Sequence, residues 1–186
     1  MTRARPFLRA GVLALLASAG VGSAQAPHPT VQPQPFGDFS QRLEEYLKLR
    51  KGLPDERTTK HRKEIVDRRR ALATAIREAR KDAKQGDIFT PEISAEFNAA
   101  IRETFQGSKA VNVRKTIRQG EPLAPVRLSV NGSYPEHLPV TTVPPTLLRR
   151  LPQLPERLAY RIVAHDFVLQ DTEARLVIDF IPGALP

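Results

Sequence analysis

The sequence contains no cysteine among its 186 residues. Disulfide bonds, thiolate catalysis, thiolate-bound zinc and iron–sulfur clusters all need cysteine sulfur, so each of them is excluded. A lipid-modified cysteine anchor is excluded for the same reason. The chain must therefore be stabilised by burial of apolar side chains, which is feasible at this length.

Recognisable catalytic motifs are also missing. The chain has no Gly-x-Ser-x-Gly elbow, no phosphate-binding glycine loop and no dinucleotide fingerprint. The histidines are not paired at metal-ligand spacing such as i, i+4 on one helix. They are His28, His61, His137 and His165. We expect neither a metal nor a cofactor.

No apolar run is long enough to span a bilayer. The run Ala10–Gly22 has 13 residues, whereas a transmembrane helix needs about 20. Three arginines precede this run, and no acidic residue occurs before Asp38. A basic start, a short apolar run and small residues at cleavage spacing are typical of a secretory signal peptide. We therefore expect residues 1–24 to be a signal peptide and the mature chain to have no membrane span.

Two cleavage positions fit the small-x-small rule. A cut after Ala26 would place Pro27 next to the scissile bond, and the fixed φ of proline makes this a poor protease site. We therefore expect cleavage between Ala24 and Gln25. The mature protein is predicted to be exported, to the periplasm or to the extracellular medium.

The remaining sequence predicts an α+β fold. Residues 25–37 are rich in proline and are expected to form a flexible leader. Residues 38–119 are expected to be helical, as a bundle of three to four helices. Residues 120–186 combine a proline-rich segment with a small C-terminal antiparallel β-meander.

The expected helices follow from apolar spacing and from their terminal residues. The first has an apolar face at Phe39, Leu43, Tyr46 and Leu47. The second should cover about 55–85, with Gly86 as its C-terminal cap. The third should begin with Thr90 as N-cap and Pro91 in its first turn. Residues 108–118 are expected to form a short fourth helix.

The expected strands lie near the C-terminus. Residues 127–130 are predicted to form a strand leading into the Asn131-Gly132 turn, and residues 146–151 about one helical turn. The meander rests on alternating apolar residues, with breaks at 165–166 and at 171–173. These residues are Tyr160, Ile162, Phe167, Leu169, Leu176, Ile178 and Phe180.

Three stretches together resemble a family of exported bacterial proteins of unknown function. They are Gln85–Glu92 (QGDIFTPE), Val143–Leu148 (VPPTLL) and Leu176–Pro182 (LVIDFIP). The resemblance implies export and covers most of the mature chain. It implies no activity, ligand or catalytic residue.

Positive charge is concentrated between residues 38 and 84, which hold 15 basic and 9 acidic residues. The candidate anion-binding residues are Lys60, Arg62, Lys63, Arg68, Arg69 and Arg70. Interspersed acidic residues leave open a solvated helix face with ion pairs at i, i+4 spacing. Nucleic acid is not an expected partner, because no aromatic residues interleave the basic ones. Anionic envelope components, or another envelope protein, are the expected partners.

Four further residues could serve acid–base chemistry near the meander. They are His165, Asp166, Asp171 and Asp179. Aspartate at such turns ordinarily serves turn geometry and local hydrogen bonds. The leading hypothesis is therefore an exported, non-catalytic accessory or binding protein of the bacterial envelope. The alternative is a periplasmic enzyme that uses these carboxylates and His165.

Overall fold

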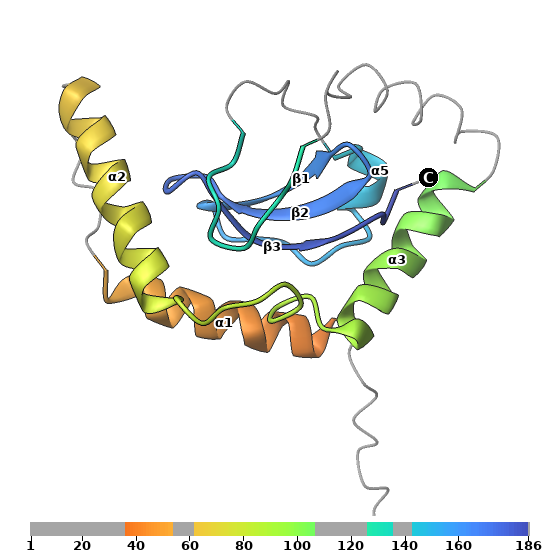
Figure 1. Ribbon diagram of the computed structural model, residues 1–186. Helices are drawn as coiled ribbons and strands as arrows, with labels where there is room; N and C mark the ends of the chain where they lie inside the picture. The colour runs from red at the N-terminus through yellow and green to blue at the C-terminus, as the bar shows by residue number, and fades with distance from the viewer. Residues whose placement is uncertain (1–35, 54–61, 107–125, 136–142, 186) are drawn as a thin grey trace, which may run out of the picture. The chain divides into compact units, whose positions relative to one another are not determined.

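The computed structural model describes residues 36–53, 62–106, 126–135 and 143–185. All of them belong to one compact unit. The helices are α1 (Gly37–Lys51), α2 (Arg62–Ala79), α3 (Pro91–Phe105) and the short α5 (Pro145–Leu148). The strands are β1 (Leu158–Val163), β2 (Asp166–Asp171) and β3 (Leu176–Ile181), in one antiparallel sheet of order β1-β2-β3 (Figure 1). The predicted α+β fold and the C-terminal meander are confirmed.

Helices α1 and α3 form where the sequence predicts them. The apolar face of α1 is buried at Phe39, Leu43 and Tyr46. The Thr90 side chain caps α3 by accepting a hydrogen bond from the backbone N–H of Ile93 at 3.3 Å, which satisfies one of the free donors at the helix start. The predicted fourth helix, residues 108–118, lies outside the described residues.

Helix α2 ends at Ala79, earlier than predicted. In a continuing helix the Lys84 N–H would donate to the Arg80 carbonyl, but two side chains bind these groups instead. The Asn131 amide donates to the Arg80 carbonyl at 2.7 Å, and the Lys84 N–H donates to the Asp87 carboxylate at 2.9 Å instead of continuing the helix. Gly86 is therefore not the helix cap. It occupies the left-handed region, at φ +95°, within the loop that joins α2 to α3.

A β-bulge in β3 changes which face its residues occupy. Leu169 pairs with Asp179 and the next residue, Gln170, pairs with Val177, so Ile178 is the extra residue. Ile178 and Asp179 consequently both face the helices. Phe180, which simple alternation places with Ile178, packs on the opposite face of the sheet.

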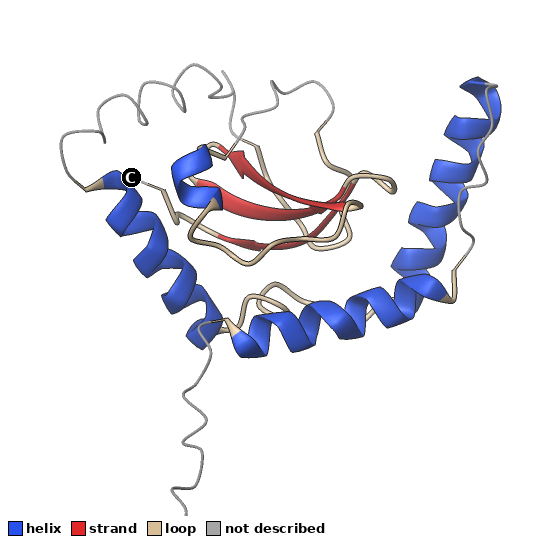
Figure 2. Ribbon diagram, turned by 180° about the vertical axis from the view of Figure 1, so that it is seen from behind, coloured by secondary structure: helices blue, strands red, loops and turns tan. Residues whose placement is uncertain are grey.

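The sheet is covered on both faces. On one face, a cluster of aromatic rings from α1, the α2–α3 loop and α3 packs on Tyr160 and Phe167. On the other face, Tyr134 joins a smaller cluster that includes Val168 and Val177. Figure 2 shows the three neighbouring strands in red and the helices in blue.

The segment 126–135 lies along β3 without forming the predicted strand at 127–130. A turn forms one residue earlier than the predicted Asn131-Gly132 turn: the Gly132 N–H donates to the Ser129 carbonyl at 3.0 Å, and Asn131 has φ +60°. The Asn131 N–H donates to the Val177 carbonyl at 2.8 Å, and the Val177 N–H donates to the Gly132 carbonyl at 2.9 Å. Gly132 is required here, because a Cβ would lie 2.8 Å from the Ser129 carbonyl oxygen. The turn therefore fixes this segment against the edge of the sheet.

Candidate anion-binding site

The four candidate acid–base residues do not come together. His165 and Asp166 lie at the start of β2 and Asp171 lies at its end, about 17 Å away for an extended strand. The His165 ring is exposed and its Nδ1 lies 3.3 Å from the Leu185 carbonyl oxygen. The Asp166 carboxylate accepts a hydrogen bond from the Gly183 N–H at 2.9 Å. This arrangement gives no support to the enzymatic alternative.

Asp179 organises the loop that joins α2 to α3. It is fully buried, and its carboxylate accepts hydrogen bonds from the backbone N–H groups of Gly86, Ile88 and Phe89 at 2.8–3.0 Å. It also accepts one from the N–H of Phe180 at 2.8 Å. The β3 bulge turns this carboxylate toward the loop. Asp179 therefore has a structural role in this conformation.

Asp171 connects the sheet to α1. It is fully buried and accepts hydrogen bonds from the Tyr46 hydroxyl and from Arg50 Nε, both at 2.8 Å. It also accepts hydrogen bonds from the backbone N–H groups of Glu173 and Ala174 in the β2–β3 turn. Burial, and next the negative charge of Asp171, raise the pKa of Tyr46, so the phenol stays protonated and remains the donor.

The structure separates the six predicted anion-binding residues. Lys60 lies outside the described residues, and nothing is described of the Arg62 side chain. Lys63 is exposed, and Arg68 pairs with Glu64 at 3.7 Å on the surface of α2. The other two, Arg69 and Arg70, line a groove beside the sheet.

This groove has a volume of about 770 Å³ and an unusual lining. Among the described residues, five arginines and no acidic residue line it. Helix α2 forms one wall, the segment 126–135 forms another, and the end of the β2–β3 turn closes it. The arginines are Arg69, Arg70, Arg77, Arg127 and Arg175. We call it the arginine groove.

The α2 wall of the arginine groove is a single helix face. Val66, Arg69, Arg70, Ala73 and Arg77 follow the i, i+3, i+4, i+7, i+11 spacing and fall within an arc of about 100°. The acidic residues of α2 project from another part of the helix surface. Positive charge is therefore gathered on the side that faces the groove.

Hydrogen bonds hold the two walls together. Arg77 donates from Nε to the Asn131 carbonyl and from Nη2 to the Ser133 hydroxyl, both at 3.0 Å. Arg80 donates to the Asn131 side-chain oxygen at 3.0 Å and to the Ile178 carbonyl at 3.2 Å. Arg69 donates to the Glu173 carbonyl at 3.2 Å. These contacts fix α2 beside the sheet, so the groove is preformed.

Two arginines of the groove lack an ion pair among the described residues. Within the described ranges, neither Arg70 nor Arg127 forms an ion pair with an acidic side chain. Arg175 adopts φ +53°, a left-handed conformation that favours glycine. The position nevertheless carries a long cationic side chain that lines the groove.

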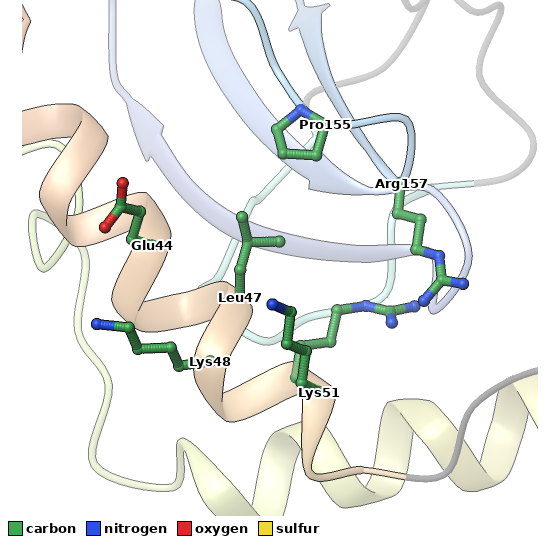
Figure 3. A pocket seen from close by; sticks show the side chains of 7 residues that line it. Glu44, Leu47, Lys48, Lys51, Pro155 and Arg157 are labelled. Atoms are coloured by element: carbon green, nitrogen blue, oxygen red, sulfur yellow. The ribbon is translucent and has the colours of Figure 1, made fainter.

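A second pocket, of about 450 Å³, lies between α1 and the segment before β1. Leu47, Lys48 and Lys51 project from α1, and Arg157 comes from the opposite side (Figure 3). Its charge is offset more strongly than that of the arginine groove. Glu44 also lines it, and both of its arginines, Arg50 and Arg157, pair with Glu173.

Sequence reasoning found only part of the arginine groove. It identified Arg69 and Arg70 from the density of basic residues but missed Arg77, Arg127 and Arg175. Arg77 carried a usable signal, since it lies seven residues after Arg70 on the same helix face. The sequence around Arg127 and Arg175 gave no sign that they belong to the groove, because only the tertiary fold brings them to α2.

The described part of the chain shows neither a membrane-spanning helix nor a metal-binding cluster. None of the helices found there is long and apolar enough to cross a membrane. In the same ranges, no three His, Asp or Glu side chains gather in a way that could hold a metal ion.

No protein-family model, curated protein or solved structure matches this chain. The resemblance to exported bacterial proteins therefore stays a prediction. The chemistry of the arginine groove alone carries the functional proposal.

Proposed function

We propose that this protein is an exported, non-catalytic binding protein of the bacterial cell envelope that contacts an anionic envelope component through the arginine groove. The observation that carries the proposal is a preformed groove whose described lining contains five arginines and no acidic residue. Guanidinium groups bind phosphates and carboxylates in a fixed two-pronged geometry. Clustering guanidinium groups in one groove makes a positive potential that attracts anions.

Export rests on the signal-peptide pattern of residues 1–24, and fractionation of the expressing bacterium tests it. We expect the protein in the periplasm or the medium, beginning at Gln25 by mass spectrometry of the intact chain. An unprocessed chain beginning at Met1 and confined to the cytoplasm would overturn the localisation. The anion-binding proposal has its own test.

Binding to anionic vesicles tests the groove itself. We expect the mature protein to sediment with phosphatidylglycerol vesicles and not with phosphatidylcholine vesicles. Binding should weaken steeply between about 50 and 300 mM salt, because screening shortens the range of charge interactions. The double variant Arg70→Glu/Arg127→Glu should lose most of this binding and keep its fold, since neither side chain forms an ion pair within the described residues.

The matched control reverses two arginines elsewhere. Arg102 and Arg149 are exposed and lie outside the arginine groove. The variant Arg102→Glu/Arg149→Glu changes the net charge by the same amount and should bind nearly as well as the unchanged protein. Equal losses in both variants would show that net charge, not the groove, causes binding. Absence of binding by the unchanged protein to all anionic probes would refute the function.

A further inference from the structure

We infer that the arginine groove recognises a ligand with two phosphoryl groups separated by an uncharged spacer of about 10 Å. This inference rests on the proposed function and specifies its ligand. It comes from the arrangement of the arginines along the α2 wall of the groove, where they occupy two separate positions.

The arginines of the α2 wall lie at two positions along the helix axis, which we call levels. Arg69 and Arg70 lie at one level and Arg77 at the other, with Ala73 between them. Seven residues separate Arg70 from Arg77, which corresponds to about 10 Å along the helix axis. The small Ala73 leaves room between the two levels. A ligand that satisfies both levels needs two anionic groups about that far apart.

On α2, the described groove-lining residue between the two levels is the uncharged Ala73. Val126, Tyr134 and Pro135 line the groove from the facing segment, whereas Val66 lies about one helical turn before Arg69 and therefore outside the two levels. The Ser133 hydroxyl also lines the groove, within hydrogen-bonding distance of Arg77. Such a surface suits an uncharged spacer, with a hydroxyl available for a polar substituent.

Phosphoryl groups fit the two levels better than carboxylates do. Arg69 and Arg70 are adjacent in sequence and project about 100° apart, so they approach the groove from two directions. A carboxylate offers two oxygens, which one guanidinium can satisfy. A terminal phosphoryl group offers three acceptor oxygens and up to two negative charges, and can therefore accept from both arginines.

Two envelope sources supply this chemistry: a saccharide phosphorylated at two positions, or two neighbouring phospholipid headgroups. Titration calorimetry with soluble probes separates them. The probes are hexane-1,6-diol bisphosphate, hexyl monophosphate, adipate and an unacylated disaccharide with a phosphate on each ring. We expect the bisphosphate to bind at least about tenfold more tightly than the monophosphate, the gain of a second charged hydrogen-bonding contact. Adipate should bind most weakly.

One arginine substitution tests whether the second phosphoryl group uses the Arg69–Arg70 level. Arg70→Gln should remove most of the bisphosphate advantage and leave monophosphate binding at the Arg77 level. The matched control is Arg68→Gln, two residues before Arg70 and outside the arginine groove, where the side chain pairs with Glu64 at 3.7 Å on the surface of α2. This control should keep the full advantage, since exposed pairs contribute little.

The outcomes separate the inference from the proposed function. Tight binding of the disaccharide with two phosphates identifies a saccharide as the source. If the disaccharide does not bind, but the protein binds vesicles and prefers the bisphosphate to the monophosphate, the source is a pair of phospholipid headgroups. Equal affinity for bisphosphate and monophosphate, with vesicle binding still lost in Arg70→Glu/Arg127→Glu, overturns the two-phosphoryl inference and leaves the function standing. No binding of any probe or vesicle overturns both.

Discussion

Replacing Asp179 with alanine is expected to lower the free energy of unfolding by about 4 kcal/mol. The substitution leaves the backbone N–H groups of Gly86, Ile88 and Phe89 without their shared acceptor in a buried site. Each unsatisfied buried donor costs about 1–3 kcal/mol, and the lost side chain adds a cavity. Urea unfolding followed by circular dichroism measures the change.

A second substitution and a control keep this prediction testable if the alanine variant does not fold. Asp179→Asn retains one acceptor oxygen but loses the negative charge, so we expect an intermediate loss of about 2 kcal/mol. Asp82→Ala, at an exposed position of the same loop, should change stability by less than about 0.5 kcal/mol. Similar stabilities for Asp179→Ala and Asp82→Ala would contradict the structural role of Asp179.

The second large effect is expected at Asp171. Asp171→Ala removes the acceptor of both the Tyr46 hydroxyl and Arg50 Nε, and Arg50 is itself only 4% exposed. A buried charge that loses its partner typically costs about 3–5 kcal/mol. Because Glu173 also pairs with Arg50, we expect the lower end of this range.

A double-mutant cycle shows whether the loss comes from the ion pair. Arg50→Met in the Asp171→Ala background removes the unpaired charge and should recover part of the stability, because replacing both members of a buried pair by apolar groups is often tolerated. We expect a coupling energy of at least about 1.5 kcal/mol. Additive effects, within about 0.5 kcal/mol, would contradict a direct interaction between Arg50 and Asp171.

The elements that sequence predicts well depend on local signals. Thr90 and Pro91 fix the start of α3, and apolar alternation with two short turns fixes the meander. The sequence misplaces the end of α2 and the face of Phe180. Both errors come from long-range contacts: the Asn131 side chain ends the helix from about 50 residues away, and the bulge at Ile178 accompanies the binding of the α2–α3 loop by Asp179.

The candidate site was also predictable from the sequence only where the signal is local. Arg69 and Arg70 are visible in sequence as a basic run, but their separation from Arg68 requires the orientation of α2 against the sheet. The buried roles of Asp171 and Asp179 are invisible for a similar reason. Their partners, in α1 and in the α2–α3 loop, lie about 90 to 125 residues away.

The arginine groove is tested most directly by observing arginine side-chain Nε–Hε resonances during titration with hexane-1,6-diol bisphosphate. Guanidinium groups that bind a phosphoryl group change chemical shift and exchange more slowly with water. The account predicts saturable shifts at Arg70 and Arg77, with Arg102 and Arg149 unchanged. Equal shifts at all four arginines, or shifts confined to Arg102 and Arg149, would contradict it.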